Sequence, residues 1–426
     1  MLGMAPAFQR DPFAYAREVA RHGDLVAVPF PGMQLVYVLR PDLLEQVLVR
    51  DARRYRKGRF MSRVEIVFGE GLLLAEGDAW RKQRLRMAPA FSSQAVREQA
   101  GAIGPMAVAR LEDWKDGEVR DLHADMMGLT LEVVLRLLFG TSASDEDLAA
   151  IRAAFHDIAA HFARALELVV SIPLWIPTPA NVRFKRARAV LDGVVSRILR
   201  ERRAQPDPGR DLLGRLLSAA DAAGAPLSEA QLQDEVRTLL LAGHETTAVA
   251  LTTACWMLAG APESQEWAWE ELDALDGPID ISTPLPRVTA ILDEAMRLCP
   301  PAPVFPREPI EDVTLDGHTI PAGTTLIVPP FLVHRDARWF DAPEEWRPSR
   351  WTDTMRAELP RFAYFPFGGG PRICIGAHLA TAEARIVLAE LLRRFALTPA
   401  EGAALTLVPS ITMRPTAPVE LVIRRR

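Results

Sequence analysis

The amino-acid sequence predicts a mainly α-helical fold with small β-sheets, an α+β class, with the strand signals at its two ends. Apolar residues recur with a helical period from about Ala79 to Leu298, with breaks at Pro173–Pro179 and Pro206–Gly209. One helix in this stretch is unusually long, whereas short alternating segments precede and follow the stretch. No repeat or flexible linker marks a boundary, so we expect one domain over residues 1–426.

The long helix has clear start and stop signals. Ser228 is a favourable N-cap, and Gln231 three residues later completes a capping box. The helical pattern then continues to Gly260, a residue that suits the position just after a helix. The predicted length is roughly 31 residues, compared with about 8–20 for a typical globular helix. Because most of its sides are apolar, we expect this helix to cross the core.

The two ends of the chain mix helices with short strands. A hairpin is expected around Pro31-Gly32, and a second one turns at Asp316-Gly317. A Pro-rich, aromatic stretch runs to Pro366, and a β segment ends the chain. The expected elements are helices at Pro12–His22, Pro41–Arg50 and Ala377–Phe395, and strands at Leu25–Val28, Gln34–Val38, Val313–Leu315, His318–Ile320 and Thr325–Val328.

Composition narrows the class of protein. The chain has 426 residues, is 49% hydrophobic, and is therefore able to bury a large core. Its net charge of −5 argues against nucleic-acid binding, which needs a basic surface. Three cysteines are too few for a disulfide framework and fit a reducing cytosol. With a polar N-terminus and no apolar run of about 20 residues, we expect a cytoplasmic protein without a membrane anchor.

A glycine-rich loop near the C-terminus carries one cysteine directly before a predicted helix. It reads Phe367-Gly-Gly-Gly-Pro-Arg-Ile-Cys374-Ile-Gly376. Glycines at 368, 370 and 376 let backbone N–H groups approach the sulfur, and the helix N-terminus favours thiolate over thiol. A thiolate of this kind suits an iron that must cleave an O–O bond. The alternative is a glycine-rich turn with a structural cysteine. A turn of that kind needs only Gly-x-Cys, whereas here Phe, two spaced glycines, Arg and a further Gly also stand at fixed offsets from the cysteine.

A polar segment lies midway along the long helix, at Ala242-Gly243-His244-Glu245-Thr246-Thr247. Glycine weakens a helix interior, and a threonine hydroxyl bonds back to a carbonyl one turn earlier. Together these residues predict a local opening of the helix where an acid and a hydroxyl relay protons. The alternative is a bent core helix with a satisfied buried threonine.

Both segments resemble the cytochrome P-450 family, and the likeness extends in order over nearly the whole chain. The loop is similar to the family's haem-binding signature, which implies Cys374 as the iron ligand of heme b, with Phe367, Gly368 and Gly376 in the cofactor site. The helix segment resembles the family motif that assigns proton delivery to Glu245 and Thr246. The resemblance implies a cytochrome P-450 fold with the haem between the long helix and the thiolate loop.

A Glu-x-x-Arg pattern occurs five times, at Glu18, Glu294, Glu344, Glu358 and Glu390. The occurrence at Glu294 alone precedes a proline pair, the β segment and Trp346-Arg-Pro-Ser-Arg350-Trp351. That order resembles the family, in which the three charged side chains form a buried ion network beneath the loop. The resemblance therefore implies that Glu294, Arg297 and Arg350 are structural.

Four further residues are candidates for binding the haem propionates. Trp80 and Arg84 are four apart and share a helix face, as in the family's Trp-x-x-x-Arg pair. Arg307 and Arg372 resemble additional propionate arginines. The alternative for each is an ordinary surface residue in an Arg-rich chain. His244 and His378 lie near the motifs but lack the surrounding loop chemistry, so we expect neither to bind iron.

The resemblance is weakest at Lys57–Asp78, Phe155–Pro179 and Pro409–Arg414, where the family lines its substrate pocket. These stretches are apolar and include Trp175 and Met413. We expect hydroxylation of a hydrophobic molecule, a terpenoid or carotenoid before a fatty acid, by a monomer with no fused reductase. Electrons would come from a ferredoxin or flavodoxin with an NAD(P)H-dependent reductase. The alternatives are a peroxide-driven peroxygenase and a non-catalytic haem sensor.

Overall fold

A computed structural model describes the chain except residues 1–7, 9, 31–32, 59–60, 62–63, 143, 168–172, 208, 210, 219–226 and 410–411. Its α-helices are α2 Pro12–Ala20, α3 Pro41–Glu45, α4 Glu65–Phe68, α5 Gly77–Met87, α6 Ser93–Ala100, α7 Ile103–Glu112, α8 Leu122–Phe139, α9 Asp145–Glu167, α10 Pro179–Arg203, α11 Leu212–Ser218, α12 Glu229–Ala259, α13 Pro262–Asp273, α14 Pro286–Leu298, α15 Pro330–Val333, α16 Asp353–Glu358 and α17 Ala377–Arg394. Its strands are β1 Leu25–Phe30, β2 Met33–Val38, β3 Tyr55–Arg56, β4 Glu118–Asp121, β5 Phe305–Pro309, β6 Val313–Leu315, β7 His318–Ile320, β8 Thr325–Val328, β9 Phe395–Pro399, β10 Leu407–Pro409, β11 Met413–Pro415 and β12 Glu420–Arg425. The expected helical stretch and the two β-containing ends are thus confirmed.

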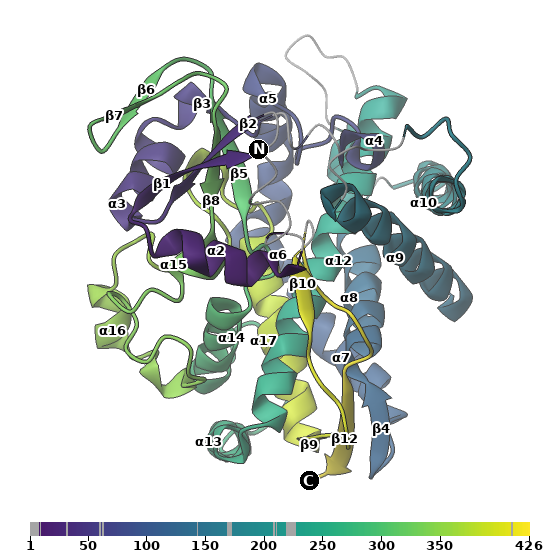
Figure 1. The fold of residues 1–426 in the computed structure, drawn as a ribbon. Coiled ribbons are helices and arrows are strands. Elements are labelled where there is room, and N and C mark those ends of the chain that lie inside the picture. The colour runs from purple at the N-terminus through teal and green to yellow at the C-terminus, as the bar shows by residue number, and fades with distance from the viewer. Residues whose placement is uncertain are drawn as a thin grey trace.

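The strands from the two ends of the chain combine into one sheet. Its order is β1-β2-β8-β5-β3, in which β1 and β2 pair antiparallel and β2 and β8 pair parallel. Strands β6 and β7 form a separate hairpin around the predicted turn. In Figure 1 this sheet lies with α2 and α3 on one side of the molecule, and α8, α9 and α10 lie on the other. The tip of the first hairpin, Pro31-Gly32, lies outside the described residues.

Helix α12 crosses the core, as its apolar pattern predicts. The Ser228 side chain accepts from the Gln231 backbone N–H and the Gln231 side chain accepts from that of Ser228, which completes the predicted capping box. The helix packs against α8, α14 and α17, and Figure 1 shows α12 and α17 side by side in the middle of the fold. The helix ends at Ala259 and Gly260 follows it, as expected, with a right-handed backbone conformation.

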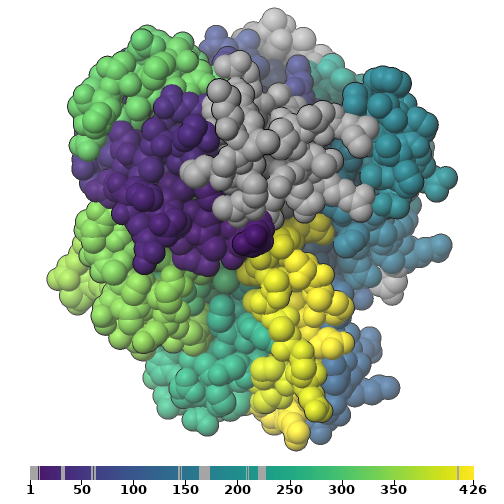
Figure 2. All heavy atoms as spheres, viewed as in Figure 1, coloured from purple at the N-terminus to yellow at the C-terminus, as the bar shows by residue number. Residues whose placement is uncertain are grey.

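Two other local expectations were incomplete. The predicted helix at Pro41–Arg50 is α-helical only to Glu45, and Gln46–Arg50 is a π-helix. Strand β4 interrupts the stretch that reads as helical, because its partner β12 comes from the far end of the chain. A pairing partner so distant in sequence leaves no local periodicity. Figure 2 shows the C-terminal segment as a strip beside the β4 region on this face.

Buried apolar side chains form two main clusters. The larger one surrounds α8, α12 and α17, and the smaller one surrounds the five-stranded sheet. Within the residues that the structure describes, no helix is both long and apolar enough to cross a membrane.

Candidate functional site

The cysteine loop is held in place by its own backbone. A short 3₁₀ turn, Gly370–Arg372, precedes Cys374, whose N–H donates to the Phe367 carbonyl over 3.0 Å. Gly368 and Gly370 have φ values of 71° and 67°, a conformation that favours glycine. A Cβ atom on Gly370 would collide with the Leu48 carbonyl of the π-helix. The loop is therefore locked against the N-terminal part of the chain just before α17 begins.

Cys374 is the accessible cysteine of the three. Its side chain is exposed, whereas Cys255 and Cys299 are buried in the core. Although solvent reaches this residue, the protein atoms packed around its sulfur desolvate the thiol and raise its pKa, while a Gly376 N–H and the Arg84 guanidinium act in the opposite direction. Because burial is the largest influence, the loop alone leaves a thiol, and a coordinated metal would remove the proton. In the part of the chain that is described, no three His, Cys, Asp or Glu side chains converge on a metal site.

Cationic side chains gather beside the loop. Arg372 pairs with Glu76 and donates to the Ala75 carbonyl over 2.7 Å, and its guanidinium lies 4.1 Å from the centre of the Trp80 ring. Burial and the charge of Arg372 lower the pKa of Arg307 to about 10. The predicted residues Trp80, Arg372 and Arg307 therefore lie in one neighbourhood, and Arg84 faces the cysteine itself.

Lys57 belongs to the same cluster and was missed. Burial lowers its pKa to about 7, and the charges of Arg372 and Arg307 contribute to the shift. Within the described residues, neither Lys57 nor Arg307 forms a salt bridge. Glu76 is the carboxylate whose charge raises the pKa of Lys57, Arg307 and Arg372. Three cations with one carboxylate suit a ligand that carries two negative charges. The signal that could have found Lys57 is that only four lysines occur in this arginine-rich chain.

The polar segment of α12 lies on the accessible side of an otherwise buried helix. Ala242 is exposed and Thr246 is half-buried, although the neighbouring Leu241 and Thr247 are buried. The Thr246 hydroxyl donates to the Ala242 carbonyl over 2.9 Å, as expected. The helix nevertheless stays continuous through this turn, so the predicted opening of its hydrogen-bond ladder does not appear.

The glycine of this segment has a packing role. A Cβ atom on Gly243 would lie 2.9 Å from Cγ2 of Val134, which is too close. Gly243 therefore permits the close contact between α12 and α8, a role that the sequence pattern did not reveal.

Glu245 is held by the C-terminal strands. Its Oε1 atom lies 3.1 Å from Nε of Arg414, and both side chains are 16% exposed. Burial raises the pKa of Glu245, and Arg414 and the Thr412 hydroxyl oppose that shift. The acid of the predicted relay is therefore largely shielded from solvent and has a charged partner that sequence reasoning did not find.

Neither histidine near the motifs is placed as a ligand. His244 is buried against the Phe155 ring, with its Nδ1 atom 2.6 Å from the Leu240 carbonyl. His378 is exposed on the first turn of α17.

Glu294, Arg297 and Arg350 form a buried ion network. Nε and Nη2 of Arg297 donate to the two Glu294 oxygens over 2.8 and 2.9 Å, and Nε of Arg350 donates to Glu294 over 3.0 Å. Glu294 also accepts from the Trp351 indole N–H over 2.9 Å. The side chains of Glu294 and Arg297 are fully buried. The network ties α14 to the segment that leads into the cysteine loop.

Arg297 also binds three backbone carbonyls. Its Nη1 atom donates to His334 and Pro343 over 3.0 and 2.5 Å, and its Nη2 atom donates to Glu345 over 3.1 Å. One guanidinium thus connects α14 to three points of the following chain.

The stretches expected to line a substrate pocket are only partly described, since residues 59–60, 62–63, 168–172 and 410–411 lie outside. Two of the apolar residues named for this role differ in exposure. Trp175 is 78% exposed, and Met413 is buried in the smaller core cluster.

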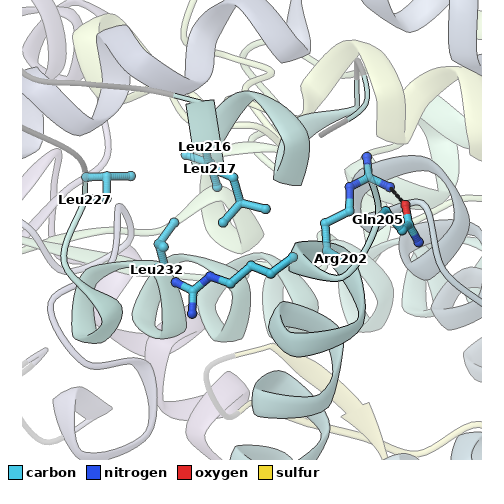
Figure 3. A pocket seen from close by; sticks show the side chains of 7 residues that line it. Arg202, Gln205, Leu216, Leu217, Leu227 and Leu232 are labelled. Atoms are coloured by element: carbon cyan, nitrogen blue, oxygen red, sulfur yellow. Dashed lines mark hydrogen bonds between the residues drawn. The ribbon is translucent and has the colours of Figure 1, made fainter. Parts of the chain in front are cut away.

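A separate hollow of about 350 Å³ lies between the end of α10, α11 and the start of α12. Figure 3 shows Arg202 and Gln205 on one side of it and Leu216, Leu217 and Leu232 on the other. None of the residues that line it belongs to the cysteine loop, the cation cluster or the polar segment of α12, so its position gives it no role in the chemistry.

Comparisons with known proteins agree with this arrangement. Residues 2–421 match the family described as Cytochrome P450. The chain is 31% identical to pentalenene oxygenase of Streptomyces avermitilis, over 93% of this chain and 89% of the relative, and 30% identical to cyclooctatin synthase of Streptomyces melanosporofaciens, over 97% and 91%. The crystal structure of the cytochrome P450DA heme domain superimposes with a TM-score of 0.85 at 27% identity, over 97% of this chain and 93% of that one. The chain belongs to the cytochrome P450 family of haem-dependent monooxygenases.

Proposed function

We propose that this protein hydroxylates a terpenoid, using dioxygen and electrons from a separate ferredoxin or flavodoxin and its NAD(P)H-dependent reductase. The observation that carries the substrate class is the pair of relatives named for pentalenene and cyclooctatin, which are terpenoids. Carotenoids belong to the same chemical class, and fatty acids are the next candidates.

The cofactor fits the residues that surround the loop. A haem iron with a thiolate ligand activates dioxygen, because the thiolate pushes electron density that favours O–O cleavage. Cys374 would supply the thiolate, while Lys57, Trp80, Arg84, Arg307 and Arg372 would hold the two propionates. Heme b, which is bound without covalent bonds, suits a chain that has no Cys-x-x-Cys-His pattern. Phe367, Gly368 and Gly376 shape the loop around the ligand.

Proton supply falls to α12. Thr246 presents a hydroxyl on the accessible side of the helix, and Glu245 next to it is a buried acid. A donor of this kind delivers protons to the dioxygen site and limits the loss of reduced oxygen as peroxide. A peroxygenase or a haem sensor would not need this pair.

The substrate proposal is tested by titrating purified holoprotein with sesquiterpene hydrocarbons, carotenoids and fatty acids, and recording the low-to-high-spin shift of the Soret band. Turnover with NAD(P)H, ferredoxin and reductase should then give a hydroxylated terpenoid. A spin shift only with fatty acids would overturn the substrate class. Product only with added peroxide, or no product from any compound that binds, would favour the peroxygenase or the sensor.

Arg307→Gln should weaken haem retention, because Arg307 lacks a carboxylate partner of its own in the described part of the chain. A hydrogen bond to a charged group contributes about 1.5–3 kcal/mol, so haem transfer to an acceptor protein should become about 10-fold to 100-fold faster. Arg53→Gln, on an exposed arginine, is the matched control. An unchanged transfer rate in Arg307→Gln would remove Arg307 from the propionate site.

Thr246→Ala should uncouple the enzyme while sparing haem binding. Product formed per NAD(P)H should fall by roughly tenfold, and hydrogen peroxide should rise. The fall is smaller than the full contribution of a positioned proton donor, because water replaces the lost hydroxyl in part. Thr247→Ala is the matched control, since its hydroxyl also bonds back one turn, to Gly243 over 3.3 Å, but its side chain is buried. A larger effect at Thr247 would show that the relay is assigned to the wrong hydroxyl.

A further inference from the structure

The partner of Glu245 comes from a distant part of the chain. Arg414 lies on β11, and its Nε atom is 3.1 Å from Glu245 Oε1 on α12. Each side chain is only 16% exposed, so water screens the pair weakly. No other carboxylate within the described ranges forms a salt bridge with Arg414. The pair is therefore a specific connection between α12 and the C-terminal strands.

Strand β11 is anchored so that Arg414 reaches α12. The Met413 N–H donates to the Pro301 carbonyl over 2.8 Å, and the Met413 side chain is buried. Thr412 immediately precedes β11, and Arg414 is the second residue of the strand. Both reach Glu245: Arg414 through the salt bridge and Thr412 through a side-chain hydrogen bond. Two groups of one short C-terminal segment thus fix a single carboxylate.

Two histidines near Arg414 are neutral. From α8, His123 has its pKa lowered to about 4 by burial; Asp121 opposes this shift and Arg414 adds to it. On α12, burial lowers the pKa of His244 to about 4, with His123 and Arg414 contributing. At neutral pH both imidazoles are therefore uncharged. Arg414 supplies the positive charge that acts on Glu245.

We propose that Arg414 is the positioning residue of the proton relay, which holds the Glu245 carboxylate toward β11 until that carboxylate accepts a proton. This inference rests on the relay of the proposed function. When a proton from water neutralises Glu245, the charge attraction to Arg414 is lost. The neutral acid is then released to turn toward Thr246, the next residue of α12, whose hydroxyl accepts this proton while it gives up its own toward the dioxygen site. Arg414 acts only through Glu245.

Infrared spectroscopy of the holoprotein tests this directly. In Arg414→Met, Glu245 loses its counter-charge and should be protonated at neutral pH, giving the C=O stretch of a buried carboxylic acid. The band should be absent in the unaltered protein and in Arg414→Lys, which keeps the charge, and in Arg414→Met combined with Glu245→Gln. If Arg414→Met does not fold, Arg414→Gln carries the same prediction. Arg424→Met, on an exposed arginine of β12, is the control and should show no band.

The pH profile of oxygen consumption gives a second readout. A proton-donating acid loses its active form as pH rises through its pKa. Glu245 therefore sets the alkaline limb of the profile, the pH range in which the rate of oxygen consumption falls as pH rises. Without Arg414 the pKa of Glu245 rises, and the limb should move to higher pH by about 1–3 units. Glu245→Gln should slow oxygen consumption and abolish the limb.

Different outcomes distinguish the positioning role of Arg414 from the proton relay itself. No new carboxyl band and an unmoved limb in Arg414→Met, while Glu245→Gln still slows oxygen consumption, would overturn the positioning role and leave the relay intact. A Glu245→Gln variant with an unchanged rate and limb would overturn the relay, and the positioning role with it.

Discussion

Arg297→Ala is expected to yield little folded, haem-loaded protein. The substitution leaves the Glu294 carboxylate fully buried without Arg297 and removes hydrogen bonds to the carbonyls of His334, Pro343 and Glu345. Breaking a buried ion pair by removing one partner costs about 3–5 kcal/mol, a large part of the stability of a typical domain. Denaturant unfolding and the haem content of purified protein measure the loss.

The same sequence pattern supplies a matched control. Glu18 and Arg21 are also three residues apart on a helix, 3.1 Å from each other, but their side chains are 61% and 78% exposed. Arg21→Ala should leave stability nearly unchanged, since exposed pairs contribute little. Arg297→Lys should rescue poorly, because an ammonium group cannot reproduce the planar fork of Arg297. Normal expression and haem content in Arg297→Ala would contradict a structural role.

The elements that could be predicted from sequence are those with local signals. The capping box at Ser228 and the apolar period after it gave the bounds of α12, and the three short strands from Val313 to Val328 agree residue for residue with β6, β7 and β8. Strand β4 was missed because β12, its partner, is nearly 300 residues away and leaves no local pattern.

The residues of the candidate site also differ in whether a local sequence signal identifies them. Cys374, Glu245 and Thr246 stand in contiguous motifs, so their identities could be read from the sequence. Lys57 and Arg414 lie far along the chain from the groups that they approach, and only the fold brings them there. A charge in an apolar segment, such as Arg414 in its strand, is a signal of function that gains meaning only when its partner is seen.

Cys374→Ser is expected to eliminate thiolate ligation and monooxygenase turnover together. Cys374 is the accessible cysteine at the start of α17, with Gly376 N–H and Arg84 directed at its sulfur. A serine hydroxyl is a poor ligand in this position and does not supply the electron density that favours O–O cleavage. Cys255 and Cys299 are buried in the core and lie outside the loop, so neither can replace Cys374.

The carbon monoxide difference spectrum of the dithionite-reduced holoprotein tests the assignment of Cys374 most directly. The unaltered protein, Cys255→Ala and Cys299→Ala should all show the long-wavelength Soret band of thiolate-ligated haem. Cys374→Ser should lose that band even where haem remains bound. A retained band in Cys374→Ser, or its loss in Cys255→Ala or Cys299→Ala with the fold intact, would contradict Cys374 as the iron ligand.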